Sequence, residues 1–95
     1  MKEIKFNLKK EEYSTMLFAT SLNKAVSKLS SEVIVKTVSE NNISQTVDAK
    51  TMLGVIAIMH GTADELIFEV RGPEEALDAM ELKAAITKIL ELSAK

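Results

Sequence analysis

Residues 49–58 read Ala-Lys-Thr-Met-Leu-Gly-Val-Ile-Ala-Ile, and this stretch does most to decide the fold. Threonine is a good N-cap because its side-chain oxygen accepts a hydrogen bond from the first helical turn. Thr51 therefore predicts a helix that begins after it, and Gly61 is a suitable residue to end that helix. Apart from Gly54, residues 52–59 are apolar nearly all round the helix. We expect part of this apolar surface to be exposed unless another element covers it.

Upstream of this helix the pattern changes from strand to helix and back. Residues 4–8 alternate apolar and polar side chains, which predicts a half-buried strand. From about Ser14 the period becomes helical, and residues 33–38 are β-branched at five of six positions, which is typical of a strand. The helical stripe consists of Phe18, Leu22, Val26 and Leu29.

Downstream of the second strand, residues 39–44 have the composition of a turn, and residues 45–48 predict a short returning strand. A fourth strand is predicted over residues 65–70, where Leu66, Phe68 and Val70 alternate with polar neighbours or Ile67. Gly72 and Pro73 then interrupt the pattern, and Pro is suited to opening a helix. The stripe of this last helix consists of Ala79, Leu82, Ile86 and Ile89.

The order of elements is therefore β-α-β-β-α-β-α, in one domain over residues 1–95. Strands with alternating faces and helices with one apolar stripe predict two layers, with the helices on one side of a sheet. Ferredoxin-like domains share the first six of these elements. The order alone leaves both architectures open.

The segment Lys50-Thr51-Met52-Leu53-Gly54-Val55 resembles the second helix of HPr, the histidine-containing phosphocarrier family of the bacterial sugar phosphotransferase system. The resemblance covers essentially the whole chain, with Phe6, Ala19 and Gly72 also matching. It implies an α+β open-faced β-sandwich, in which an antiparallel four-stranded sheet carries three helices on one face. The hairpin over residues 33–47 is expected to be several residues longer than is usual for the family.

HPr-like domains carry phosphate on a histidine at the start of the first helix, followed by an arginine and a proline. Imidazole is nucleophilic near neutral pH, and the helix N-terminus and the arginine stabilise the phosphoryl charge. The alignment places Thr15 at the histidine, Leu17 at the arginine and Phe18 at the proline. We therefore expect a degenerate site without histidyl phosphotransfer, and predict that the chain is not an enzyme.

Other residues are weaker candidates for that chemistry. Ser14 and Thr15 are more simply explained as helix N-caps, and Glu11 and Glu12 would repel an incoming phosphoryl group. The only histidine, His60, is expected at a helix C-terminus, where the helix dipole disfavours phosphate. Since Asp64 is its only nearby candidate partner, no metal site and no cofactor are predicted.

Thr51 has two interpretations. As an N-cap it contributes about 1 kcal/mol to helix stability. The resemblance also implies a regulatory phosphorylation site, since many Gram-positive HPr proteins carry a kinase-modified serine at this position. Asp48, three residues earlier, would oppose an added phosphate.

The resemblance also implies a partner-binding patch where the first two helices meet. Here it would contain Met16, Leu17, Met52, Leu53 and Ile56. A methionine-rich exposed patch is typical of adaptable binding surfaces. In HPr-like proteins this region docks enzyme I and regulators.

Composition excludes several other classes of protein. A net charge of −2 and a single arginine, Arg71, argue against nucleic-acid binding. The chain has no cysteine, which excludes disulfides and thiolate metal sites. The first residues do not resemble a signal peptide, and no apolar run approaches the roughly 20 residues that cross a bilayer. We expect a cytoplasmic protein with no membrane partner.

The leading hypothesis is a non-catalytic regulatory or adaptor protein, similar in lacking the histidine to the catabolite-repression HPr paralogue. Its expected partners are phosphotransferase-system components, a kinase or a transcription regulator. One alternative is an atypical phosphocarrier that uses Ser14, Thr15 or His60. Another is a scaffold domain that dimerises through its apolar helix faces, and the predicted state is a monomer or a weak homodimer.

Overall fold

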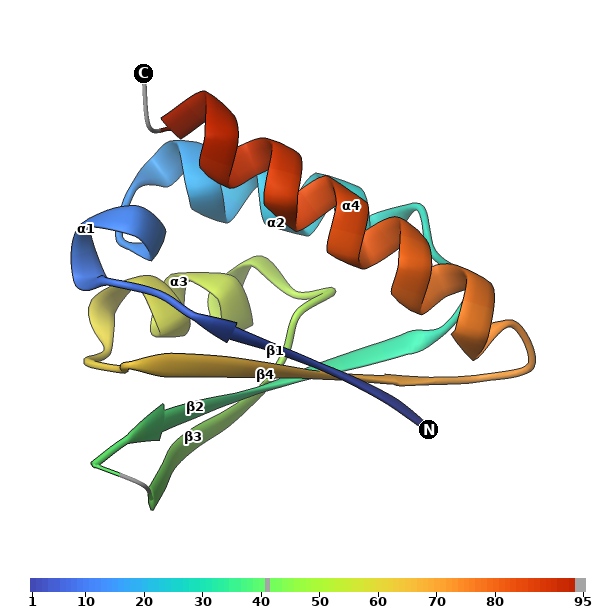
Figure 1. The fold of residues 1–95 in the computed structure, drawn as a ribbon, viewed down its shortest axis with the longest axis horizontal. Helices are drawn as coiled ribbons and strands as arrows, with labels where there is room; N and C mark the ends of the chain where they lie inside the picture. Colours follow the sequence, from blue (N-terminus) through green and yellow to red (C-terminus); the bar gives the residue numbers. More distant parts are fainter. Residues whose placement is uncertain (41, 94–95) are drawn as a thin grey trace.

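A four-stranded antiparallel sheet forms one layer of the molecule and the helices form the other (Figure 1). The computed structural model describes residues 1–40 and 42–93. The strands are β1 (Lys2–Asn7), β2 (Glu32–Ser39), β3 (Asn42–Asp48) and β4 (Glu65–Arg71). The helices are α1 (Lys10–Tyr13), α2 (Met16–Ser27), α3 (Met52–His60) and α4 (Glu75–Ser93).

The strand order across the sheet is β1-β4-β2-β3, so β4 and β2 are central and β1 and β3 are the edges. The registers bring Val35 of β2 opposite Phe68 of β4, and Phe68 opposite Ile4 of β1. Side chains alternate faces along each strand, so these apolar residues share the face that the helices cover. The other face is open and carries charged residues such as Lys36, whose ammonium pairs with Glu69 at 2.9 Å.

The hydrophobic core lies between this sheet and the helices. The predicted stripe of the first long helix is confirmed, because Phe18, Leu22 and Val26 are all buried. The inward residues of β4 and the stripe of α4 are buried as well, except that Ala79 is only partly buried. The buried apolar residues of these two elements are Leu66, Phe68, Val70, Leu82, Ile86 and Ile89.

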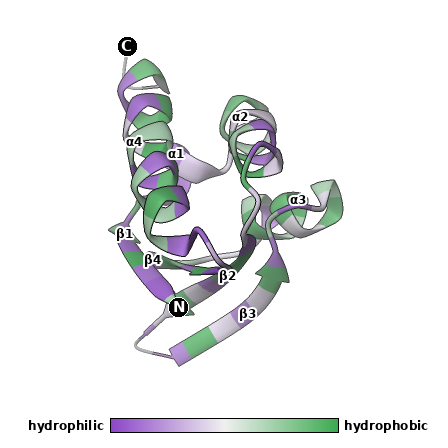
Figure 2. Ribbon diagram, turned by 90° about the vertical axis from the view of Figure 1, so that its right-hand side faces the viewer, coloured by the Kyte–Doolittle hydropathy of each residue, from purple (hydrophilic) through white to green (hydrophobic). Residues whose placement is uncertain are grey.

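Helix α2 lies between α3 and α4 above the sheet (Figure 2). It packs against both, whereas α3 also contacts β3 and α4 contacts β1. The open sheet and the order of the main elements confirm the predicted fold class. No helix in the described part of the chain is long and apolar enough to cross a membrane.

The structure differs from the sequence-based prediction in two places. A one-turn helix, α1, precedes the first long helix, which begins at Met16 and not at Ser14. The β2–β3 hairpin has a shorter turn than predicted, because β2 continues to Ser39 and β3 begins at Asn42. Cross-strand pairing between these residues outweighs their turn-like composition, and a register shift at Thr37/Val38 accommodates the extra residue. Residue 41, part of the predicted turn, lies outside the described residues.

Candidate functional site

Thr15 is the N-cap of α2. Its backbone is extended, and its side-chain oxygen accepts a hydrogen bond from the Phe18 amide at 3.1 Å. This geometry confirms the capping role predicted for Thr15. Phe18 is buried in the core, while Leu17 is 54% exposed. Of the three residues predicted to align with the HPr phosphorylation motif, Thr15 therefore caps a helix, Phe18 packs inside the protein and Leu17 is an exposed apolar side chain.

The short helix α1 is fastened to the C-terminal end of α3. The Tyr13 hydroxyl accepts a hydrogen bond from the Ala63 amide at 2.7 Å and lies 3.1 Å from the Ala63 carbonyl oxygen, to which it donates. The Lys10 ammonium donates to the carbonyl oxygen of Met59 at 3.1 Å and to that of Gly61. These contacts hold the segment before α2 against the last turn of α3.

His60 is the last residue of α3 and its side chain is exposed. The prediction that it would end this helix is confirmed, but the carbonyl groups at this helix end are bound by Lys10. Because Lys10 and Thr15 belong to the same short segment, the only histidine lies at the same end of the molecule as Thr15. The chain order alone does not reveal this proximity.

Thr51 is the N-cap of α3 and is exposed. Its hydroxyl oxygen accepts a hydrogen bond from the Gly54 amide at 3.0 Å and donates its proton to the Asp48 carbonyl oxygen, also at 3.0 Å. The carboxylate of Asp48 accepts from the Lys50 amide at 2.9 Å. The hydroxyl therefore uses its proton and one lone pair to join the end of β3 to the first turn of α3.

Gly54 is required by this tight connection. A Cβ atom there would overlap the Asp48 carbonyl oxygen and would stand 2.8 Å from the Thr51 hydroxyl oxygen. The glycine within an otherwise apolar helix is thus explained by the close approach of the β3–α3 connection. It needs no ligand-binding explanation.

Helices α2 and α3 run antiparallel beside one another. The Asn23 side-chain amide donates to the carbonyl oxygens of Lys50 at 3.2 Å and Ala49 at 3.4 Å, which fixes the later half of α2 beside the start of α3. At the opposite end, α1 and the start of α2 meet the end of α3 through Lys10. The two helices that carry the predicted patch therefore lie side by side.

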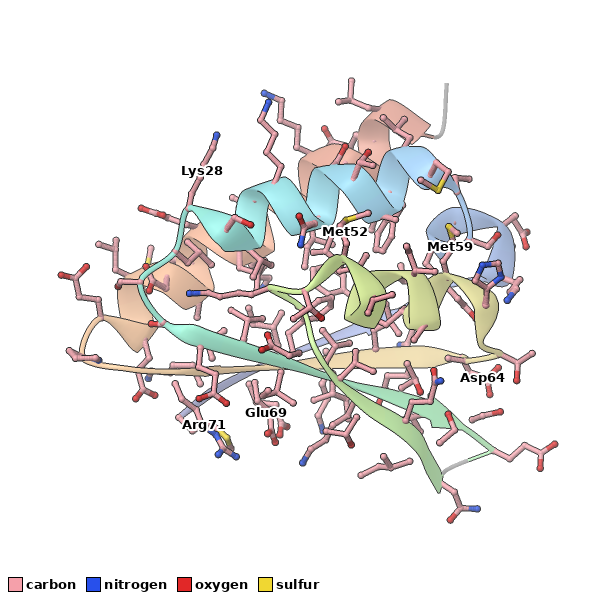
Figure 3. All side chains as sticks on the ribbon, turned by 180° about the vertical axis from the view of Figure 1, so that it is seen from behind. Lys28, Met52, Met59, Asp64, Glu69 and Arg71 are labelled. Carbon is pink, nitrogen blue, oxygen red and sulfur yellow. The ribbon has the colours of Figure 1, made fainter. Side chains whose placement is uncertain are left out.

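The residues of the predicted patch lie on different faces of α2 and α3. Met16 is seven residues before Asn23 and so shares the face of α2 that turns toward α3. Met52 and Ile56 share one face of α3, and Met52 lies between the two helices in Figure 3. Leu53 lies on a different face of α3 and is 81% exposed.

Leu17 lies on the outer face of α2, which it shares with the exposed Lys24 seven residues later. Met59, which the prediction did not place in the patch, shares one face of α3 with Met52 and is half-buried. Figure 2 shows hydrophobic colouring over much of α3. We use the name α2/α3 surface for the five predicted residues Met16, Leu17, Met52, Leu53 and Ile56.

The residues that hold this surface in place were not found from the sequence. Tyr13, Lys10 and Asn23 each bind backbone atoms far away in the chain, and Lys50 donates to the Leu29 carbonyl oxygen at 2.9 Å. The only available signal was that Tyr13 is the single tyrosine of the chain. Among the described residues, no group of three or more potential metal ligands is close enough to hold an ion.

Comparison with known proteins gives the family. The sequence profile described as "PTS HPr component phosphorylation site" matches residues 6–91. This match spans most of the chain, which therefore belongs to the HPr family of phosphotransferase-system phosphocarrier proteins. No curated protein sequence matches the chain.

Two solved structures share the fold. HPr-C-His from Thermoanaerobacter tengcongensis is 21% identical, with a TM-score of 0.74, and the match covers 96% of this chain and 97% of that chain. The histidine-containing phosphocarrier protein of Mycoplasma is 18% identical, with a TM-score of 0.75, and the match covers 94% and 96% of the two chains. The TM-scores and coverage establish a common fold.

Proposed function

We propose that this HPr-family chain is a cytoplasmic regulatory or adaptor protein that binds protein partners through the α2/α3 surface. The observation that carries this proposal is the exposure of large apolar side chains on two adjacent helices. Met16 is 56% exposed and Leu53 is 81% exposed, although the core below them is well filled. Exposed apolar groups gathered in one place are typical of protein–protein contact surfaces.

The environment of Thr15 supports a non-catalytic role. A threonine hydroxyl is a weak nucleophile unless a base removes its proton, and the Thr15 oxygen already accepts the Phe18 amide. Leu17 offers no positive charge to a phosphoryl group. Glu12 is close to Thr15 in sequence, and its carboxylate, which accepts from the Lys9 amide at 2.8 Å, would repel an incoming phosphoryl group. These features favour binding over phosphate transfer.

Thr51 is our candidate for regulatory phosphorylation. Its side chain is exposed at the N-terminus of α3, where the helix dipole favours negative charge. A phosphoryl group on the hydroxyl oxygen would replace the proton that Thr51 donates to the Asp48 carbonyl oxygen. It would also place about two negative charges beside Met52 and Leu53. Modification would therefore change which partners the α2/α3 surface accepts.

The test of partner binding uses enzyme I from the same host as the probe. Leu53→Glu should weaken binding by at least tenfold, because a charge would enter the apolar contact. Met80→Glu is the matched control, since Met80 is 71% exposed but lies on α4, beyond α2. Isothermal titration of both variants, after confirming equal melting temperatures, measures the difference. Equal affinity of the two variants would contradict the assigned surface.

The test of Thr51 uses mass spectrometry of the protein from its own host and a comparison of two N-caps. Thr51→Val should abolish the modification, whereas Thr15→Val should leave it unchanged. Both residues cap long helices with similar hydrogen bonds, so this pair controls for local structure. Absence of phosphate on Thr51 in both carbon-rich and carbon-starved cells would reject the switch and leave Thr51 as a cap.

A second candidate function is phosphate transfer through His60. It is favoured by the position of this histidine at the same end of the molecule as Thr15, with the Lys10 ammonium nearby. Incubation with enzyme I and labelled phosphoenolpyruvate distinguishes the two functions. Acid-labile label that disappears in His60→Gln would support transfer, while an unlabelled protein that still binds enzyme I would support the adaptor role.

A further inference from the structure

Strand β1 forms an uncovered edge of the sheet. It pairs with β4 on one side, and within the described residues no strand pairs with its other side. Its register with β4 runs without a shift from Lys2 to Asn7. The opposite edge strand, β3, has a register shift in its pairing with β2 and lies against α3. Irregular pairing disfavours addition of a further strand, so β1 is the edge better suited to pairing.

The hydrogen-bond pattern shows which groups of β1 face outward. The Leu8 amide, directly after β1, donates to the Asp64 carbonyl oxygen at 3.1 Å and thus points toward β4. Backbone groups alternate sides along a strand, so those of Phe6, Ile4 and Lys2 also point toward β4. The N–H and C=O groups of Glu3, Lys5 and Asn7 consequently point away from the sheet.

The side chains of β1 are complementary to a second copy of the same strand. In an antiparallel pair whose two-fold axis passes beside Ile4, Glu3 of each copy lies opposite Lys5 of the other. Those residues carry the outward backbone groups, so Glu3 and Lys5 form hydrogen-bonded pairs as well as opposite-charge pairs. Ile4 faces Ile4 of the second copy as a non-hydrogen-bonded pair, in which side chains come closest.

Neighbouring registers lack this match. Opposed residues of two paired strands point to the same face of the sheet, so the two-fold axis must pass beside a residue and not between two residues. The nearest alternatives to a pair centred on Ile4 are therefore pairs centred on Glu3 or on Lys5. Centring the pair on Glu3 places two carboxylates opposite one another, and centring it on Lys5 places two ammonium groups opposite one another. Like charges in directly opposed positions are destabilising. The charges of β1 therefore select one register.

We propose that two copies of this chain associate weakly through their β1 edges, in the register centred on Ile4, and form one continuous eight-stranded sheet. The two-fold axis is perpendicular to the sheet, so both copies carry their helices on the same face. The α2/α3 surface stays outside this interface, because α3 lies at the β3 edge of the sheet, α2 lies beside α3, and β1 forms the opposite edge (Figure 2). The dimer thus presents two partner-binding surfaces at once.

The test measures self-association by sedimentation velocity over a range of concentrations, with no tag on the chain. Glu3→Lys and Lys5→Glu should each weaken association about tenfold, since each change converts two attractive pairs into repulsive ones. Mixing the two variants should restore association, because the lysine introduced in one variant then faces the glutamate introduced in the other. Glu81→Lys and Lys88→Glu, exposed on α4, are the matched controls and should have no effect.

Amide exchange locates the contact independently of charge. As concentration rises, protection should increase at Glu3 and Lys5 and stay constant at Ile4 and Phe6, whose amides already bond to β4. A monomer at all concentrations would overturn the proposal. So would association that the Glu3→Lys and Lys5→Glu mixture fails to restore, or protection that appears on α3 and not on β1, which would place the contact on the helices.

Discussion

The hydroxyl of Thr51 donates a hydrogen bond to the carbonyl oxygen of Asp48, 3.0 Å away. The hydroxyl oxygen of Thr51 in turn accepts a hydrogen bond from the Gly54 amide. A single side chain therefore fixes the angle at which α3 leaves the sheet. Because α3 supplies half of the α2/α3 surface, stability at this cap and partner binding are physically linked.

Removal of the Thr51 hydroxyl should destabilise the protein. We expect Thr51→Ala to lower the free energy of unfolding by about 1 kcal/mol, the usual cost of losing an N-cap. Thr51→Ser keeps both hydrogen bonds and should cost much less. Urea unfolding of the two variants measures the difference, and equal midpoints would show that the hydroxyl contributes nothing to stability.

Gly54→Ala should destabilise the protein although it improves helix propensity. Propensity alone would favour alanine by about 1 kcal/mol. The new Cβ atom, however, would overlap the Asp48 carbonyl oxygen, which belongs to the backbone and has little room to move. We expect a net loss of about 1–3 kcal/mol, as for other overpacked sites. A higher melting temperature for the variant would show that the β3–α3 connection relaxes without cost.

Tyr13→Phe should loosen the attachment of α1 to the end of α3. The ring would remain in the core, but the Ala63 amide and carbonyl would lose their partner. A buried group left without its hydrogen bond costs about 1–3 kcal/mol. The expected signs are a lower unfolding midpoint and faster amide exchange at Ala63. Unchanged exchange there would contradict the role of the Tyr13 hydroxyl.

Asp78 should make stability sensitive to acid. Interaction with the Ser31 side chain lowers the pKa of Asp78, and burial opposes this shift. Hydrogen bonds from the Ser31 amide at 2.9 Å and the Ser30 hydroxyl at 3.2 Å lower the pKa further. The pKa of this carboxyl is lower in the folded protein than in the unfolded chain, where it is about 4, so the ionised form adds stability above about pH 4. This stability is lost as the pH falls through the folded-state pKa.

Asp78→Asn removes this titration. The variant should be less stable than the parent at pH 7. The difference between their free energies of unfolding should become smaller as the pH falls from about 4 toward the folded-state pKa of Asp78. Unfolding midpoints at several pH values measure the gap. Lys88→Gln, an exposed change on the same helix, serves as the control. A gap of constant size across this pH range would refute the contribution of the Asp78 carboxylate.

The strongest sequence patterns predicted the elements correctly. The stripe of Phe18, Leu22 and Val26 and the alternation around Phe68 both follow burial on one face, which leaves a direct trace in the order of residues. Caps are equally local, so Thr15 and Thr51 were identified as N-caps from the sequence. The predicted hairpin turn was too long because cross-strand pairing of Ser39 with Asn42 and of Val38 with Ile43 outweighed their turn-like composition.

The sequence by itself determined the four strands, the three long helices, their order, both helix caps and the resemblance to HPr, because each depends on residues close together in the chain. The tertiary structure decided how the candidate site is assembled. Asn23 and Lys10 bind carbonyl groups of distant segments, and these contacts set α3 antiparallel to α2. Such contacts depend on where backbone atoms lie in space, so no local pattern records them. The same holds for the outward edge of β1, whose free groups follow from its pairing with β4.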